Sequence, residues 1–198
     1  MSMGGSFFPC LLRAMTTYLA LLRGINVSGK NMLRMPDLQA TLAGLGGAEV
    51  RTYLQSGNAI FKAKQEPSAK LAARIEAALQ AEHGVDSPVL VLPVKDLDAI
   101  ATGNPLLPKS GPIEETHFHA TFLFEPVTEK AFEALGPKLP AAEGERAVWV
   151  KGAILLHCPH GYGRTKLNNN WFERALKVKA TTRNWRSVLA LREMCHGS

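Results

Sequence analysis

The spacing of apolar side chains predicts short strands alternating with amphipathic helices. In the first half of the chain, one helix begins at Pro36 and ends at a pair of glycines. A second helix has Ser68 as its N-cap and ends at Gly84. The predicted strands of this half cover residues 17–22, 50–55, 58–63 and 89–94. Ser56-Gly57, between the middle two strands, suits a tight hairpin turn.

The second half repeats this order after a short helical piece and a connection rich in glycine and proline over residues 103–112. Its predicted strands cover residues 118–124, 146–150 and 153–158. Its predicted helices cover residues 129–135, 171–178 and 184–194, the last preceded at most by a brief strand. Asn170 and Glu173 occupy capping-box positions at the start of the middle helix.

Strand, helix, strand, strand, helix, strand is the order of a ferredoxin-like α/β plait. We therefore expect an α+β protein with two ferredoxin-like subdomains in tandem, each built on an antiparallel sheet. The duplication is visible in element order and not in residue identity. The expected division is an extended or remnant N-terminus over residues 1–15, a first subdomain over 16–96, a connection over 97–115 and a second subdomain with the terminal helix over 116–198.

The composition is that of a globular protein, because 46% of the 198 residues are hydrophobic and can build a core without disulfides. The sequence lacks a run of about 18 apolar residues, so we predict no membrane segment. The three cysteines, Cys10, Cys158 and Cys195, are odd in number and far apart, which is typical of a reducing compartment. We expect a cytoplasmic protein.

The net charge of +6 is unevenly distributed. Residues 146–192 contain 10 Lys and Arg and a single acid, Glu173, whereas residues 110–145 contain 7 Glu and 2 Lys. Such a basic stretch favours an anionic partner for the C-terminal quarter of the chain. The alternative is that these cations are solvated and only keep the surface soluble.

The loop GINVSGKN, residues 24–31, matches a Walker A motif up to its last position. Asn31 stands where the motif needs a Ser or Thr hydroxyl to hold magnesium, and Pro36 starts the helix several residues too late. These departures argue against a nucleoside triphosphatase. Arg23, Asn26 and Lys30 could still hold an anion at the end of the strand, and the alternative is a flexible connection with solvated cations.

Amide and hydroxyl side chains surround the first hairpin turn, because Gln55, Ser56 and Asn58 flank Gly57. The turn itself requires only the glycine. The three side chains could therefore bind a polar ligand, with solvent as the alternative partner.

The segment GYGRTK, residues 161–166, places Tyr162, Arg164 and Lys166 on one side if it is extended. The residues Arg183, Asn184 and Trp185 repeat this mixture at the start of the final helix. A helix N-terminus favours an anion, and Tyr or Trp can stack on a ring. The two segments together suit a phosphate attached to a base or ring. Trp171 and Phe172 are expected in the core instead.

Histidines gather in the second half, where His117 and His119 share a strand face that should lie antiparallel to the strand ending in His157 and Cys158. His160 follows nearby. A transition-metal site is conceivable, but no carboxylate partner can be named, so we predict neither a metal nor a cofactor. Spacing assembles no Ser/His/Asp or Cys/His nucleophile either, so we name no catalytic residue.

Four separated blocks resemble the bacterial domain-of-unknown-function 1697 family, namely LLRGINVSGKN, RTYLQSGNAIF, GYGRTKLNNNWFERAL and ATTRNW. They span the chain from about Thr17 to Leu191. The resemblance implies a tandem ferredoxin-like fold and a cytoplasmic bacterial protein, and it implies no established activity. The polar positions that it marks are Arg23, Asn26, Lys30, Gln55, Ser56, Gly57, Asn58, Tyr162, Arg164, Lys166, Asn184 and Trp185. Ser28 and Asn168 replace the family's more usual Gly and Ser.

The leading hypothesis is a module that binds a phosphate-bearing ligand, either a nucleotide or a nucleic acid, through these basic and aromatic loops. One alternative is an enzyme acting on a small phosphorylated or anionic substrate. Another is a structural or partner-binding protein, including a homodimer with His117 and His119 at its seam.

Overall fold

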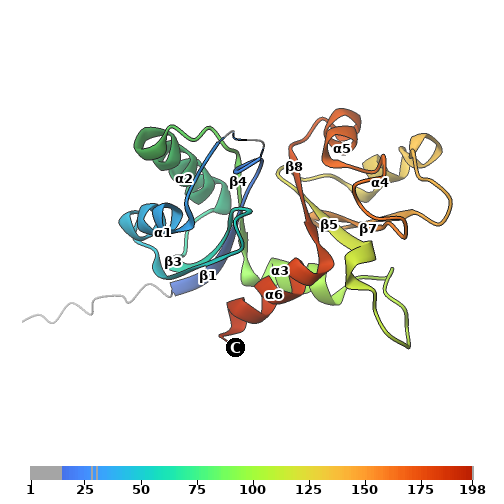
Figure 1. The fold of residues 1–198 in the computed structure, drawn as a ribbon, viewed down its shortest axis with the longest axis horizontal. Helices are drawn as coiled ribbons and strands as arrows, with labels where there is room; N and C mark the ends of the chain where they lie inside the picture. Colours follow the sequence, from blue (N-terminus) through green and yellow to red (C-terminus); the bar gives the residue numbers. More distant parts are fainter. Residues whose placement is uncertain (1–14, 28, 30, 198) are drawn as a thin grey trace, which may run out of the picture.

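The computed structural model describes residues 15–27, 29 and 31–197, which form two lobes side by side (Figure 1). Each lobe contains one four-stranded antiparallel sheet, with strand order β2-β3-β1-β4 in the first lobe and β6-β7-β5-β8 in the second. Helices α3 and α6 lie below the lobes and between them. The protein is thus a mixed α+β structure with two separate sheets.

The first lobe consists of β1 (Met15–Leu22), α1 (Met35–Gly44), β2 (Ala48–Tyr53), β3 (Asn58–Lys64), α2 (Ser68–His83) and β4 (Val89–Pro93), and is followed by α3 (Val94–Thr102). The second lobe consists of the 3-10 turn η1 (Glu115–His117), β5 (Phe118–Leu123), α4 (Glu129–Glu133), η2 (Gly136–Lys138), β6 (Arg146–Val150), β7 (Ala153–His157), α5 (Asn169–Leu176) and β8 (Ala180–Asn184). Helix α6 (Trp185–His196) ends the described chain.

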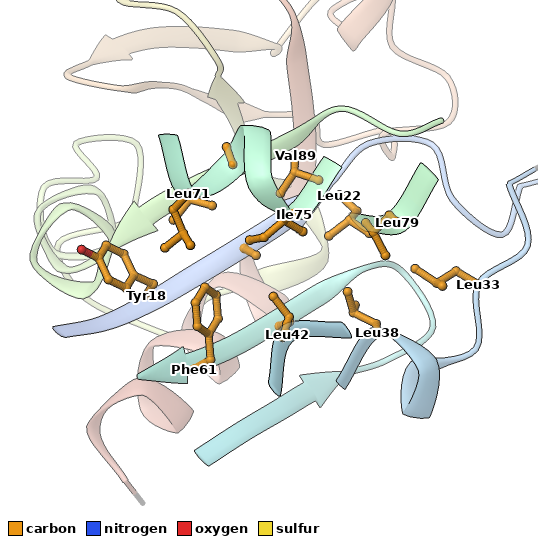
Figure 2. Packing of buried hydrophobic residues seen from close by; sticks show 14 of the residues in the cluster. Tyr18, Leu22, Leu33, Leu38, Leu42, Phe61, Leu71, Ile75, Leu79 and Val89 are labelled. Carbon is orange, nitrogen blue, oxygen red and sulfur yellow. The ribbon is translucent and has the colours of Figure 1, made fainter. Parts of the chain in front are cut away.

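Both faces of the first sheet are buried, because alternate residues of β1 enter different cores. Tyr18 and Leu22 point to the face covered by α1 and α2, where they pack with Phe61 of β3 and Ile75 of α2 (Figure 2). Leu19 points to the opposite face. Burial of one such side chain contributes roughly 1.5–3 kcal/mol. The continuous apolar run of β1 is therefore that of a strand covered on both sides.

The opposite face of the first sheet shares a central core with the second lobe. Leu19 and Ile60 of the first sheet belong to one apolar cluster with Phe122 of the second sheet and with Trp185 and Val188 of α6. A third cluster packs α4 and α5 against the outer face of the second sheet. The two lobes are consequently joined by a common core rather than by a linker alone.

Two predicted helix caps are wrong. Pro67, not Ser68, occupies the N-cap of α2, and no side chain caps that helix. Asn168, not Asn170, caps α5 and accepts a hydrogen bond from the Trp171 N–H. The cap lies earlier than predicted because Asn169 and Asn170 already form the first turn of the helix. Because the predicted capping box does not form, the Glu173 carboxylate is available for other contacts.

The brief strand expected before the last helix is β8, which pairs with β5 over its five residues. It completes the second sheet, so both lobes contain four strands and the same order of strands and main helices. None of the helices in the described residues is both long and apolar enough to cross a bilayer.

Candidate functional site

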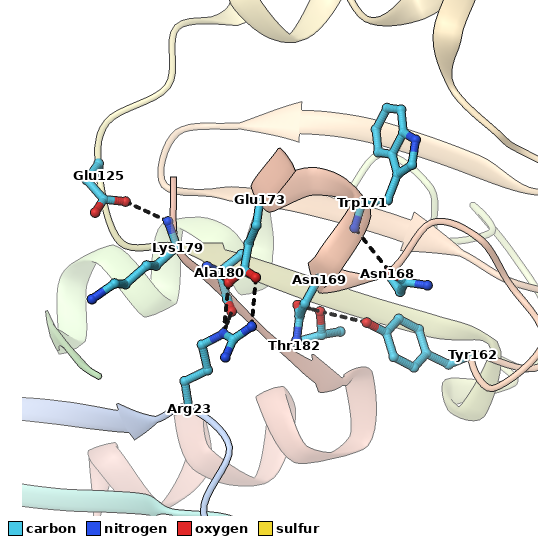
Figure 3. Close-up of polar contacts among 10 residues, drawn as sticks. All are labelled: Arg23, Glu125, Tyr162, Asn168, Asn169, Trp171, Glu173, Lys179, Ala180 and Thr182. Atoms are coloured by element: carbon cyan, nitrogen blue, oxygen red, sulfur yellow. Dashed lines mark hydrogen bonds and ion pairs between the residues drawn. The ribbon is translucent and has the colours of Figure 1, made fainter. Parts of the chain in front are cut away.

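The end of β1 and the turn between α5 and β8 meet at the junction of the lobes. Arg23 donates hydrogen bonds to both carboxylate oxygens of Glu173, with Nε–Oε1 at 2.8 Å and an Nη–Oε2 distance of 2.7 Å (Figure 3). Its Nε also lies 3.0 Å from the Ala180 carbonyl oxygen. This bidentate geometry is the strong form of an ion pair. Arg23, predicted to bind an anion, is thus already paired across the junction.

Two carboxylates accept hydrogen bonds from the backbone at the start of β8. Glu173 Oε1 accepts the Ala180 N–H at 2.9 Å, and Glu125 Oε2 accepts the Lys179 N–H at 2.9 Å (Figure 3). Lys177, at the C-cap of α5, has a left-handed backbone with φ 57°. That conformation is costly for a residue with a Cβ atom, so the tight reversal between helix and strand stores a small amount of strain.

An open groove of about 480 Å³ lies at this junction. Its walls are Arg23, Pro88, Glu125, Glu173, Lys177, Val178 and Lys179. Lys177 and Lys179 are exposed, and neither forms a salt bridge with a carboxylate in the part of the chain that the structure describes. Three cations therefore face two carboxylates that already accept backbone hydrogen bonds, which gives the groove an excess of positive charge.

Arg183 connects the lobes deeper inside. Its Nε donates to Asn58 Oδ1 at 2.5 Å, and its Nη2 donates to the carbonyl oxygens of Leu22 at 2.9 Å and Ser56 at 3.2 Å. The residue is only 9% exposed, and burial lowers the pKa of its guanidinium to about 10, so it remains charged at neutral pH. Arg183 is a structural clamp between β8 and the first hairpin, and it offers no surface to a ligand.

The QSGN turn is divided between surface and interior. Asn58 is 0% exposed, and its Nδ2 donates to the Tyr53 carbonyl oxygen at 3.0 Å and to Ser56 Oγ at 2.8 Å. Asn58 is therefore occupied by the turn and by Arg183, contrary to the predicted ligand contact. Gln55 and Ser56 are exposed. Gly57 is required, because its φ is 72° and a Cβ there would lie 2.7 Å from Leu22 Cβ.

Asn26 holds its own loop closed. Its Nδ2 donates to the carbonyl oxygens of Leu33 and Gln55, both at 2.9 Å, and its Oδ1 accepts the Leu33 N–H at 2.8 Å. These bonds satisfy the amide, so its role in the structure is to brace the loop against the hairpin. Lys30, the predicted cation of this loop, lies outside the described residues. Helix α1 begins only at Met35, which agrees with the argument against a phosphate-binding P-loop.

The GYGRTK segment forms turns rather than an extended strand, so its predicted alternation is wrong. The Tyr162 ring points inward and stacks on His119, with ring centroids 4.6 Å apart and an angle of 25°. Its hydroxyl donates to Thr182 Oγ1 at 3.1 Å, and burial raises the pKa of Tyr162 (Figure 3). Arg164 and Lys166 are exposed. The aromatic and cationic side chains therefore separate instead of forming one face.

Trp185 is 0% exposed and belongs to the central core, so its predicted stacking on a ligand is wrong. Its Nε1 is buried without a hydrogen-bond partner in the described chain. The adjacent Asn184 caps α6 by accepting the Ser187 N–H at 2.8 Å. Residues Trp185, Val188 and Leu189 already recur at helical spacing in the sequence, and that signal is the one that predicts a core role.

The histidines do not form a metal site. His119 is buried against Tyr162, and burial lowers its pKa to about 4. Strands β5 and β7 are antiparallel as predicted, and the rings of His117 and His157 lie 6.4 Å apart between centroids. Across residues 15–27, 29 and 31–197, no group of three or more His, Cys, Asp or Glu side chains is arranged to hold a metal ion.

Sequence patterns do not predict an individual role for three residues that line the groove, Lys177, Lys179 and Glu125. The two lysines belong to the basic stretch over residues 146–192, and this stretch is the sequence feature that points to them. The groove that they line also needs Arg23 from the other lobe, which reaches Glu173 across 150 residues of sequence. Spacing within one segment cannot indicate such a contact.

Comparison with known proteins supports a family assignment. A solved structure, described as that of conserved bacterial protein SP0830 from Streptococcus pneumoniae, is similar to this chain with a TM-score of 0.67 and 28% sequence identity. The match covers 92% of this chain and 99% of that one. No curated protein matches the chain. The family model described as "Protein of unknown function (DUF1697)" matches residues 15–154, most of the chain, and the protein therefore belongs to the DUF1697 family.

Proposed function

We propose that the protein binds a small phosphate-bearing ligand in the groove at the junction of the lobes. One observation carries the proposal: Lys177 and Lys179 line the groove beside the Arg23–Glu173 pair, and neither makes a salt bridge with a carboxylate in the described chain. A phosphate group accepts several charge-assisted hydrogen bonds and carries up to two negative charges. It would neutralise both lysines and leave the ion pair intact.

The shape of the groove favours a small molecule over a nucleic acid. Its volume of about 480 Å³ is in the range of small-molecule sites, and junctions between structural units are common places for them. A nucleic acid would need a continuous basic face. Arg164 and Lys166 project from a separate loop, and they are not among the residues that line the groove.

Aromatic stacking is not part of this proposal. Trp185 is buried, and the Tyr162 ring already packs on His119. The groove walls contribute Pro88 and Val178 as their apolar side chains. Affinity would therefore come mainly from the phosphate, and a nucleotide would bind with little preference among bases.

A thermal-shift panel tests the proposal. Inorganic phosphate, AMP, ADP and a short oligonucleotide are each titrated into the protein at low salt, since a ligand that binds the folded state raises the melting temperature increasingly as its concentration exceeds its Kd. AMP and ADP should raise it with increasing concentration. A response to the oligonucleotide alone, falling steeply with added salt, would instead indicate a nucleic-acid surface. No response to any phosphate compound would overturn the proposal.

We also propose that the two lobes are ferredoxin-like plaits produced by a tandem duplication, with subdomains over residues 16–96 and 116–198. The support is the strand order, because in both sheets the second, third, first and fourth strands of the lobe follow one another. A crystal structure in which β1–β4 and β5–β8 fail to superpose with their helices on the same face would contradict it. A cytoplasmic, bacterial protein remains part of the proposal, and cell fractionation tests the location.

A further inference from the structure

A second pocket, of about 420 Å³, lies at one end of the second sheet, away from the groove at the junction. The loop between α3 and η1 supplies most of its wall through proline and leucine side chains, and Phe118 adds an aromatic ring. The polar part of the wall consists of Glu114, His117, Arg146 and His157. The pocket thus combines an apolar wall with a cluster of basic side chains.

The register of the sheet brings the basic groups together. Arg146, the first residue of β6, pairs with His157 at the end of β7, and His157 pairs with Phe118 at the start of β5. The rings of Phe118 and His157 have centroids 4.8 Å apart, and His117 precedes Phe118. Because these positions are fixed by backbone pairing, the convergence does not depend on flexible side chains alone.

The basic groups of this pocket have spare hydrogen-bonding capacity. His157 Nδ1 lies 3.2 Å from the Gly144 carbonyl oxygen, so the neutral ring that donates this bond has an unprotonated Nε2, and only the protonated ring can donate from Nε2 as well. Within the described chain, neither the Arg146 guanidinium nor the His117 ring forms a hydrogen bond or an ion pair. Glu114 is exposed and makes no salt bridge with them.

Electrostatics at the pocket favour an anion. Burial lowers the pKa of His157, and the neighbouring charges of Arg146 and His117 lower it further. The Glu114 carboxylate lines the same pocket but makes no salt bridge with Arg146 in the described residues, so the Arg146 guanidinium can pair with an anionic ligand. Arg146 carries one permanent positive charge, which a singly charged carboxylate ligand can balance.

We propose that this pocket binds a small organic carboxylate, whose carboxylate group accepts hydrogen bonds from Arg146 and, once the ring takes up a proton beside the anion, from His157 Nε2, and whose apolar body packs on Phe118 and the proline-rich loop. A guanidinium presents two parallel N–H groups to a carboxylate, which fixes its orientation. The apolar wall then selects an aliphatic or aromatic body. This site is independent of the groove between the lobes.

Benzoate is a suitable probe, titrated into the full chain and followed by NMR chemical shifts or calorimetry at pH 6.5. A ligand of this size should bind with a Kd on the order of 1 mM. Arg146→Gln should weaken binding at least about tenfold, since it removes a charge-assisted pair. His157→Asn keeps a donor for Gly144 and removes the group at the Nε2 position, and it should weaken binding by a smaller factor.

Two control variants accompany these measurements. Arg174→Gln, which changes an exposed arginine on α5, and the double variant Lys177→Gln/Lys179→Gln in the groove should both bind benzoate as the unaltered protein does. Unchanged benzoate affinity in Arg146→Gln, with circular dichroism confirming that the variant is folded, would overturn the proposal. Absence of benzoate binding, or inorganic phosphate displacing benzoate at equal concentration, would overturn it as well.

Discussion

Arg183 of β8 donates a hydrogen bond to the buried side chain of Asn58 in β3, although 125 residues separate them in sequence. The same guanidinium reaches the Leu22 and Ser56 carbonyl oxygens. One charged side chain from the last strand therefore satisfies three acceptors of the first lobe. This contact fixes the relative position of the two lobes and, with it, the groove above.

Replacement of Arg183 by Met should lower the free energy of unfolding by roughly 2–4 kcal/mol, because two buried acceptors and the partly buried Ser56 carbonyl oxygen lose their partner. Arg186→Met is the matched control, since Arg186 is exposed in the first turn of α6. Urea denaturation followed by circular dichroism measures both. A loss in Arg183→Met no larger than in the control would show that the contact does not stabilise the junction.

The Arg23–Glu173 pair should couple the lobes more weakly, because the two side chains are 31% and 20% exposed. A double-mutant cycle with Arg23→Gln and Glu173→Gln is expected to give a coupling energy of about 1 kcal/mol. A coupling energy near zero would mean that the ion pair does not stabilise the folded protein. The cycle needs only the four unfolding free energies.

Trp185→Ala should lower the free energy of unfolding by about 3–5 kcal/mol, since it opens a cavity in the core shared by both sheets. Trp185→Phe should cost clearly less, because it keeps an aromatic ring and removes the buried Nε1 donor that lacks a partner in the described chain. Trp171, only half-buried, provides the comparison through Trp171→Ala. Equal costs for the two alanine variants would contradict the central position of Trp185.

The order of helices and strands, and many of the core positions, can be predicted from the sequence. The side-chain contacts at the candidate site cannot. The apolar run of β1 predicts a buried strand, and the spacing of Trp185, Val188 and Leu189 predicts the last helix. The predicted contact of Trp185 with a ligand is wrong because the polar neighbours of Trp185 in sequence carry no information about the direction of its side chain, which the helical spacing does indicate. Arg23–Glu173 and Arg183–Asn58 join distant segments, and local pattern carries no information about such pairs.

Stability should depend on pH through His119, whose pKa in the folded protein is lowered from 6.5 to about 4 by burial. The folded state then favours the neutral ring, so its contribution is fully present above pH 6.5 and is lost as the pH falls from 6.5 toward 4. The loss is at most about 3 kcal/mol.

His119→Phe keeps a ring against Tyr162 and removes the titration. Unfolding free energies are measured for the two proteins between pH 7.5 and 4.5, and the value for the unaltered protein minus that for the variant should decrease as the pH falls. The effects of other titrating groups cancel in this comparison. Curves that remain parallel would mean that His119 is accessible to protons in the folded state.

Calorimetric titration with AMP tests the central claim, that the groove between the lobes binds phosphate, most directly. Lys177→Gln/Lys179→Gln removes both unpaired ammonium groups, and the matched control Lys130→Gln/Lys138→Gln removes two exposed lysines from α4 and η2. The groove variant should bind AMP at least about tenfold more weakly than the unaltered protein, with the control unchanged, because a charge-assisted hydrogen bond contributes roughly 1.5–3 kcal/mol. Equal AMP affinity in the groove variant and the control would contradict the claim.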